Sequence, residues 1–349
     1  MPAKRSNPAD GSGLAAVAQR AGVSLATASR VLTGSTHRVS RDLRERVLHA
    51  AESLDYVPNA SARSLSAGMR KIVGVLFHDM VDGRGYEHIR ALETEADRAG
   101  WLIMLANAGG DFEKEFHYLR AFRAERVGAI ILSGSAPYDD DYRARLNREL
   151  AAYVKHGGRV VACARHGIPF SEFVPDNFGG ARSAVEHLLS RGHRRIGIIT
   201  GPRAIAGTLD RIDGAKKAFE SYDTPWDDAL VIEGDAQSSS GRCGCERLFS
   251  RAPDMTAIFA MSDDMAFGVY EAATARGLQI PGDLSVIGYN DSAIARVLSP
   301  PLTTVSYPTV ELARGAVEAC VDDLATERMR VVFPSGLVIR ESVAPPRTR

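Results

Sequence analysis

The chain has 349 residues, 45% of them hydrophobic and 25% charged, which is enough for two or three soluble domains with cores of their own. No apolar run approaches the ~20 residues that span a bilayer, and residues 1–13 are polar and lack the apolar stretch of a secretory signal, so we expect a cytoplasmic protein. The net charge is zero, but residues 1–71 carry +6 and the remainder carries −6, which predicts that only the basic head binds a polyanion.

The first predicted elements are two helices around a short turn, after a tail over residues 1–13 that we expect to be disordered. Helical periodicity runs from Leu14 to Leu54 with breaks at Gly22 and Gly34. Gly22 can adopt the positive φ of a turn, and Ser24 is a good N-cap for the second helix. The spacing alone also fits an ordinary αα-hairpin.

The second of these helices has the residue types of a DNA-recognition helix. Hydroxyl groups suit phosphates, Arg30 can bind guanine through two hydrogen bonds, and a basic helix over residues 41–54 follows. We therefore expect a helix-turn-helix whose major-groove contacts are Ser24, Leu25, Ala26, Thr27, Ser29 and Arg30. Because Leu25 and Ala26 are apolar, base reading there would rest on thymine methyl groups or on DNA shape, and Arg30 carries the clearest polar readout.

A change of pattern after Lys71 predicts an α/β body. Short β-branched runs alternate with helical stretches such as residues 87–99, 178–190 and 264–276, which is typical of parallel βαβ units. The number of runs indicates two sheets. The expected strands are residues 72–77, 101–107, 127–133, 159–164, 195–200, 230–233, 257–261 and 284–289.

Residues 14–34, LAAVAQRAGVSLATASRVLTG, and 56–65, YVPNASARSL, resemble the headpiece and hinge of the LacI/GalR family of bacterial transcriptional regulators. The resemblance continues through the body, for example at SDDMA, residues 262–266, and at GYND, residues 288–291. It implies a small all-α helix-turn-helix headpiece joined to an α/β two-lobed, periplasmic-binding-protein-like (type I) body with parallel sheets. Ala16 and Ala28 depart from the usual Asp and Val, and we expect a looser headpiece that still binds DNA.

The resemblance also implies a division of the chain and a role for its hinge. We expect a helix-turn-helix domain over residues 14–58, a hinge helix and linker over 59–71, and a dimerisation and effector-binding body over 72–349. By position Leu65 is a wedge into the minor groove of operator DNA, where an apolar side chain unstacks bases and bends the duplex. Asn59, Ser61 and Arg63 would lie near the DNA backbone. Alternatively, Leu65 only packs a linker helix.

Polar residues near strand ends are the candidate effector contacts, because ligands of α/β folds gather at the carboxyl ends of strands. Arg211, Asn290 and Asp263 can bind adjacent hydroxyl groups of a polyol, while Phe77 and Tyr86 could offer an aromatic face. The resemblance favours Arg211 and Asn290 most, although Asn290 and Ser262 stand where the family more often has Asp and Asn. A cap, turn or interface role is the alternative for each member of the set, which is Phe77, Tyr86, Asp176, Arg211, Ser262, Asp263 and Asn290.

No catalytic constellation stands out, so we expect no enzyme activity and no cofactor. The cysteines, Cys163, Cys243, Cys245 and Cys320, lack a second pair at zinc-ligand spacing, so no metal site is expected. The function that these observations favour is a homodimeric or larger repressor that binds a pseudo-palindromic operator under the control of a sugar or sugar derivative. A solute-binding protein for a transporter and an enzyme on the same scaffold are the alternatives.

Overall fold

The computed structural model describes residues 13–32, 39–57, 69–80, 84–137, 139–321 and 328–347. The chain divides into two compact units, residues 1–70 and residues 71–349. Nearly all of the expected tail and most of the expected hinge lie outside the described residues. The predictions for Asn59, Ser61, Arg63 and Leu65 therefore stay predictions.

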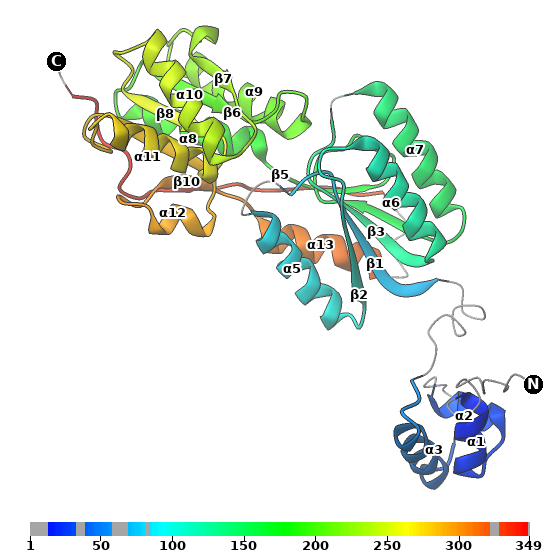
Figure 1. The fold of residues 1–349 in the computed structure, drawn as a ribbon. Helices are drawn as coiled ribbons and strands as arrows, with labels where there is room; N and C mark the ends of the chain where they lie inside the picture. The colour runs from blue at the N-terminus through cyan, green and yellow to red at the C-terminus, as the bar shows by residue number, and fades with distance from the viewer. Residues whose placement is uncertain are drawn as a thin grey trace, which may run out of the picture. The chain divides into compact units, whose positions relative to one another are not determined.

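The first unit, in its described part, consists of the helices α1 (Leu14–Ala21), α2 (Leu25–Leu32) and α3 (Arg41–Ser53) (Figure 1). Gly22 ends α1 with φ of 63°, the positive φ that the sequence predicts for the turn. The hydroxyl of Ser24 accepts a hydrogen bond from the Thr27 amide at 3.2 Å and so caps α2. The buried residues of its core have small side chains, namely Val17, Ala18, Ala21, Ala28, Val31, Val47, Ala50 and Ala51, and larger, partly buried side chains such as Leu14, Leu54 and Tyr56 pack against them.

The second unit, called the body here, contains two sheets. In the first, the described strands follow the order β11-β5-β4-β3-β1-β2, and the pairings of β11 with β5, β5 with β4, β4 with β3, and β1 with β2 are parallel. Helices α5 and α13 cover one face of this sheet, and α6 and α7 cover the other (Figure 1). The strands are β1 (Arg70–Phe77), β2 (Leu102–Asn107), β3 (Val127–Ser133), β4 (Arg159–Ala162), β5 (Ser171–Pro175) and β11 (Arg330–Phe333), and the helices are α5 (Arg84–Arg98), α6 (Phe112–Ala124), α7 (Asp140–Val154) and α13 (Thr309–Val321).

The second sheet has the order β12-β10-β9-β8-β6-β7, with only β12 antiparallel among its described strands. Helices α8 and α9 pack together on one face, and α10 and α11 pack together on the other. The strands are β6 (Ile196–Thr200), β7 (Val231–Glu233), β8 (Ala257–Ala260), β9 (Ser285–Asn290), β10 (Thr303–Ser306) and β12 (Leu337–Val338), and the helices are α8 (Asn177–Ser190), α9 (Ala206–Ser221), α10 (Ser238–Arg251), α11 (Asp263–Ala275) and α12 (Ala293–Val297), with a short 3-10 helix, η2 (Asp228–Leu230).

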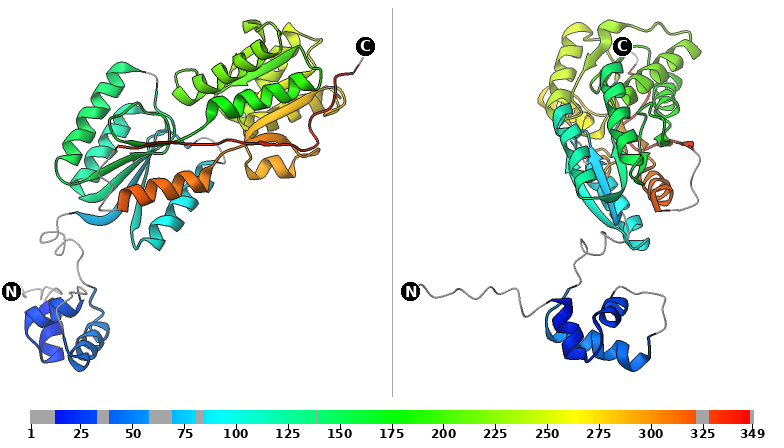
Figure 2. Two further views of the ribbon diagram at one scale, coloured as in Figure 1. Left: turned by 180° about the vertical axis from the view of Figure 1, so that it is seen from behind. Right: turned by 90° about the vertical axis from the view of Figure 1, so that its right-hand side faces the viewer.

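Each sheet with its helices forms one lobe, and the chain passes between the lobes three times. It crosses after β5, returns after β10, and crosses again from β11 to β12. Figure 2 shows the last crossing as the red segment that runs from the first sheet into the second. The lobes, called the first and second lobe below, are therefore built from discontinuous stretches of sequence.

All eight expected strands are present, with small shifts at their ends, in two sheets as predicted. Four further strands, β5, β10, β11 and β12, were not expected. The strands β11 and β12 are short, lie at sheet edges and are only partly buried, so they lack the continuous apolar run of a central parallel strand. The strands β5 and β10 are buried, but Glu172, Thr303 and Thr304 interrupt their apolar runs. Their sequence pattern is therefore that of a polar loop.

Candidate functional site

One face of α2 in the headpiece is turned away from the core. Ala28 and Val31 are buried against α1 and α3, whereas Ser24, Leu25, Ala26 and Arg30 are exposed. Thr27 and Ser29 are half-buried, and the Thr27 hydroxyl lies 2.8 Å from that of Ser24. The predicted outward set thus lies on one side of a capped helix, which is the geometry that a major-groove reader needs.

The largest described cavity that both lobes of the body line has a volume of about 430 Å³, within the ~300–1,000 Å³ of small-molecule sites. Its walls are residues that follow the carboxyl ends of strands in both sheets. From the first lobe come His78, Asp79, Gly110, Phe112, Gly134, Ser135 and Pro137, and from the other segments come Asn177, Gly201, Pro202, Ala204, Ile205, Gly207, Thr208, Arg211, Asp235, Ala236, Gln237, Met261, Ser262 and Tyr307.

Direct contacts between the lobes lie beside this cavity. The Ala206 amide donates to the Ala136 carbonyl at 3.1 Å, and Pro137 forms an isolated antiparallel bridge with Ile205. Arg165 of the first lobe forms an ion pair with Asp210 of α9. A ligand in the cavity would therefore contact both lobes where they already touch.

Arg211 lines the cavity, as predicted for an effector contact, and its guanidinium is held in place. The Nε atom donates to Asn177 Oδ1 at 2.9 Å, and Nη1 donates to the Met261 carbonyl at 2.6 Å. The group also stacks over the Tyr289 ring, 3.7 Å from its centroid. Such a fixed, planar donor is suited to bind a ligand oxygen without loss of side-chain entropy.

Ser262 also lines the cavity, whereas Asp176 does not. Ser262 caps α11 by accepting from the Met265 amide at 3.1 Å, and its hydroxyl donates to the Ala236 carbonyl at 3.2 Å. Asp176 caps α8 by accepting from the Gly179 amide at 2.7 Å. For Asp176 the structure thus supports the alternative of a helix cap.

Asp263 and Asn290 are both buried behind the cavity and not in its lining. Asp263 accepts hydrogen bonds from the Ser292 amide and hydroxyl at 2.7 and 3.0 Å and from the Thr304 hydroxyl. Burial raises the pKa of Asp263 to about 7, because desolvation outweighs these hydrogen bonds. Asn290 ends β9 with φ of 113°, a backbone conformation that residues other than glycine rarely adopt.

The raised pKa of Asp263 predicts a loss of stability as the pH rises. The unfolded chain ionises this carboxyl near its ordinary pKa of 3.8, whereas the folded chain keeps it protonated until about pH 7. The free energy of unfolding should therefore fall between about pH 4 and about pH 7, by at most about 1.4 kcal/mol per pH unit, and level off above. Asp263→Asn should make the fall between about pH 5 and about pH 7.5 smaller by about 2 kcal/mol in urea unfolding. Equal pH dependence in wild type and Asp263→Asn would contradict this, and Asp213→Asn on the exposed side of α9 is the control.

Neither predicted aromatic contact lies in the cavity. Phe77 is buried in the core of the first lobe, and Tyr86 on α5 is 71% exposed outside the lining. Phe77 points into the core between the sheet and helices α5 and α13, while the next residue, His78, lies past the end of β1 and reaches the cavity. Phe112 and Tyr307 are the aromatic residues of the described lining.

Several residues of the cavity lining are not among the predicted contacts. His78, Ser135 and Asp235 come one or two residues after strands that were expected, so the strand-end rule was sufficient to find them. Asn177 follows β5, a strand that was not expected. Phe112 begins α6, and nothing in the local sequence marks it as a ligand contact.

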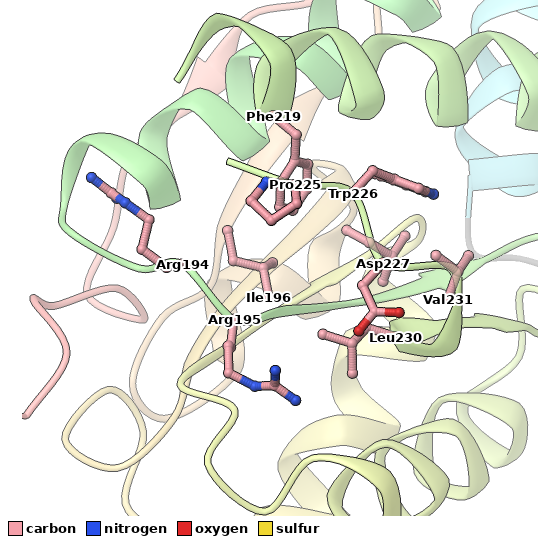
Figure 3. A pocket seen from close by; sticks show the side chains of 10 residues that line it. Arg194, Arg195, Ile196, Phe219, Pro225, Trp226, Asp227, Leu230 and Val231 are labelled. Atoms are coloured by element: carbon pink, nitrogen blue, oxygen red, sulfur yellow. The ribbon is translucent and has the colours of Figure 1, made fainter. Parts of the chain in front are cut away.

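A second, smaller cavity of about 120 Å³ lies at the opposite, amino-terminal ends of β6 and β7. Figure 3 shows Phe219, Pro225 and Trp226 at this cavity, with Arg194 and Arg195 pointing in different directions. Arg195 pairs with Asp254, Arg194 donates to backbone carbonyls, and Trp226 Nε1 donates to Asp228. Because these polar groups bind protein atoms and do not converge on the cavity, it is not the candidate ligand site.

Both units of the chain match families of known proteins. Residues 14–59 match the model of bacterial regulatory proteins of the lacI family, and residues 185–343 match a periplasmic binding protein-like domain. The regulator DegA of Bacillus subtilis is 30% identical over 95% of this chain and 98% of its own length. The regulator CelR of Thermobifida fusca is 33% identical over 93% of this chain and 96% of its own.

The chain belongs to the LacI family. It is therefore a helix-turn-helix transcriptional regulator, and its partner is DNA, as predicted. The members found are DNA-binding regulators, which agrees with the expectation that the chain is not an enzyme.

Solved structures of LacI-family proteins have the same fold. The CelR–cellobiose complex aligns with a TM-score of 0.70 and 30% identity over 95% of this chain and 99% of its own. The lac repressor dimer bound to operator and the anti-inducer ONPF aligns with a TM-score of 0.83 and 25% identity over the same shares. The predicted fold class, a helix-turn-helix headpiece with a two-lobed body, is thus confirmed. Among the described residues, no helix is both long and apolar enough to cross a membrane.

Proposed function

We propose that this LacI-family regulator is a repressor, and that a small molecule in the 430 Å³ cavity changes its affinity for a pseudo-palindromic operator. The observation that carries the proposal is the cavity itself, because polar groups from both lobes converge on it where the lobes touch. A ligand there binds one arrangement of the lobes better than another. It thereby shifts the population between two states with different DNA affinity.

The proposed DNA contacts in the headpiece are the outward residues of α2 and its cap. Arg30 and the hydroxyls of Ser24, Thr27 and Ser29 supply polar contacts, while Leu25, which is 54% exposed, and Ala26 supply apolar ones. For the hinge we keep Asn59, Ser61, Arg63 and Leu65 as proposed contacts. The proposed divisions are a tail over residues 1–13, a DNA-binding domain over 14–58, a hinge over 59–71 and a body over 72–349.

Arg30→Ala should weaken binding to the cognate operator by about 1–3 kcal/mol, because a bidentate contact with guanine is lost. Binding to a random-sequence duplex should change less, because it depends on the phosphate backbone. Gel-shift titrations of both duplexes measure the ratio of the affinity for the cognate operator to the affinity for the random-sequence duplex. Arg20→Ala, at the exposed end of α1, is the matched control that removes the same charge. An unchanged cognate affinity for Arg30→Ala would remove Arg30 from the contact set.

The proposed effector class is a sugar or sugar derivative. The relative CelR was solved with cellobiose, and the lac repressor with ONPF, which supports a cleft ligand of this class here too. Arg211 and Ser262 are the predicted contacts that line the cavity, and we propose both as effector contacts. For Asp176, Asp263 and Asn290 we propose supporting roles behind the lining.

Homodimerisation is supported by apolar side chains that the body exposes. Leu102 and Leu105, on the edge strand β2, are 71% and 44% exposed, and Val297 on α12 is 78% exposed. The lac repressor that aligns with this chain was solved as a dimer bound to operator, which also supports association of two copies here. We propose that two copies associate through these surfaces in the cytoplasm and present two headpieces to the two operator half-sites.

A thermal-shift screen tests the effector proposal. The compounds are cellobiose, galactose and ribose, together with sugar phosphates and nucleosides. We expect at least one compound to raise the melting temperature of the body and to change operator affinity in a gel shift, because it binds only the folded state. A chain that binds its operator equally with every compound would contradict effector control by these classes.

A further inference from the structure

A buried carboxylate stands directly behind one wall of the effector cavity. Glu115, on α6, is 2% exposed, and each of its oxygens has a partner. Tyr142 donates its hydroxyl to Oε1 at 2.9 Å, and His78 Nδ1 lies 3.3 Å from Oε2. Burial and the neighbouring carboxylate raise the pKa of Tyr142, so its hydroxyl stays a donor at any physiological pH.

The contact with Glu115 fixes the orientation of the His78 ring. A carboxylate accepts only, so Nδ1 carries a proton in the contact with Glu115. The other nitrogen, Nε2, has no hydrogen-bond partner within the described residues and is not among their buried unsatisfied atoms. Because His78 lines the cavity, the geometry leaves Nε2 open to a ligand there.

An aromatic ring lies beside the imidazole. Phe112, the first residue of α6, stacks on His78 with ring centroids 5.1 Å apart and planes inclined by 22°. The Phe112 ring also packs against the Tyr142 ring, with the two ring centroids 5.0 Å apart, so Tyr142 helps to hold Phe112 in place. It lines the cavity and remains 39% exposed, and an exposed ring in a lining that also offers polar groups is suited to the apolar face of a sugar ring.

The charges in the cavity disfavour an anionic ligand. Asp79 and Asp235 lie in the described lining, and Arg211 is the only lysine or arginine of that lining. Phosphate recognition usually needs several cationic groups with donors to spare. An uncharged ligand with hydroxyl groups and one apolar face suits the described lining better.

We propose that His78 and Phe112 are a specificity-determining contact of this regulator for an uncharged saccharide. His78 Nε2 binds a ligand hydroxyl, and Phe112 stacks on the sugar ring. Glu115 and Tyr142 are positioning residues that act through His78. The proposal rests on the proposed function, because it names the ligand class of the same cavity.

The test measures the affinity of the full-length protein for cellobiose, galactose and ribose by titration calorimetry. For the sugar that binds wild type best, His78→Ala and Phe112→Ala should each weaken binding by tenfold or more. His117→Ala, an exposed histidine on the same helix α6, is the matched control and should bind like wild type. If His78→Ala fails to fold, Phe112→Ala still tests the proposal. We expect this variant to fold, because Phe112 is partly exposed at the start of a helix.

A double-mutant cycle tests the positioning role of Glu115. Glu115→Gln should weaken sugar binding several-fold in the wild-type background and have no further effect in His78→Ala, because it acts through the imidazole. A purely structural role of Glu115 would give additive losses, and that result would overturn the positioning claim.

Two outcomes would overturn the proposal as a whole. In the first, His78→Ala and Phe112→Ala bind the sugar as His117→Ala does. In the second, none of the three sugars binds, while a sugar phosphate or nucleoside changes operator affinity. That result would agree with control by an effector but would contradict an uncharged saccharide as the ligand. If no compound of any class changes operator affinity, the proposed function fails together with it.

Discussion

Val47→Ala is expected to lower the melting temperature of the headpiece by about 10–20 °C while leaving that of the body unchanged. Val47 on α3 is fully buried in a core of three valines and five alanines. Removal of its two methyl groups loses their transfer free energy and leaves a cavity, which together amount to about 2–3 kcal/mol. A domain of this size has only about 3–5 kcal/mol of stability in total, so the loss is a large fraction of it.

Differential scanning calorimetry of the full chain measures both transitions, because the headpiece and body are separate compact units. Leu48→Ala is the matched control, since Leu48 is the next residue of α3 and 49% exposed. Operator affinity should fall with the folded fraction of the headpiece, while sugar binding by the body stays as it was. Equal melting temperatures for Val47→Ala and Leu48→Ala would contradict the core described for this unit.

Arg211→Ala should lower effector affinity a hundredfold or more, which corresponds to about 3 kcal/mol. The substitution removes a charged donor, leaves the Met261 carbonyl without its side-chain donor, and leaves Asn177 Oδ1 with only the long contact from the Tyr289 hydroxyl at 3.5 Å. Operator binding without effector should be nearly unchanged, because the headpiece is untouched. The response of operator binding to effector should therefore disappear.

Effector titrations monitored by operator binding and by thermal shift measure the two properties separately. Arg182→Ala is the control, because Arg182 lies on the neighbouring helix α8 and pairs with Glu186 at the surface. An effector affinity of Arg211→Ala within a few-fold of wild type would place the ligand elsewhere in the body.

The headpiece could be predicted from the sequence because its determinants are local. The positive φ of Gly22, the Ser24 cap and the inward Ala28 and Val31 are properties of single residues at helical spacing. The apolar runs of the central parallel strands were equally visible. The strand β11, in contrast, pairs with β5 across a gap of more than 150 residues, and no local pattern encodes that contact.

The candidate effector site could be predicted only in part. Arg211 and Ser262 were found, because they lie where strand-end rules and the family resemblance agree. Phe77, the last residue of β1, is buried in the core of the first lobe, and the next residue, His78, lines the cavity. The contact between His78 and Glu115 joins a strand end to a helix, and its existence depends on how α6 packs on the sheet.

In the proposed mechanism, one chain couples sequence-specific DNA binding to a ligand in the body. The most direct measurement selects duplexes from a random pool with the full-length protein and then measures affinity for the enriched sequence with and without cellobiose, galactose and ribose. We predict an enriched inverted repeat whose affinity one sugar changes by tenfold or more, about 1.4 kcal/mol of coupling. No enriched sequence, or an enriched sequence whose affinity no small molecule changes, would contradict the account.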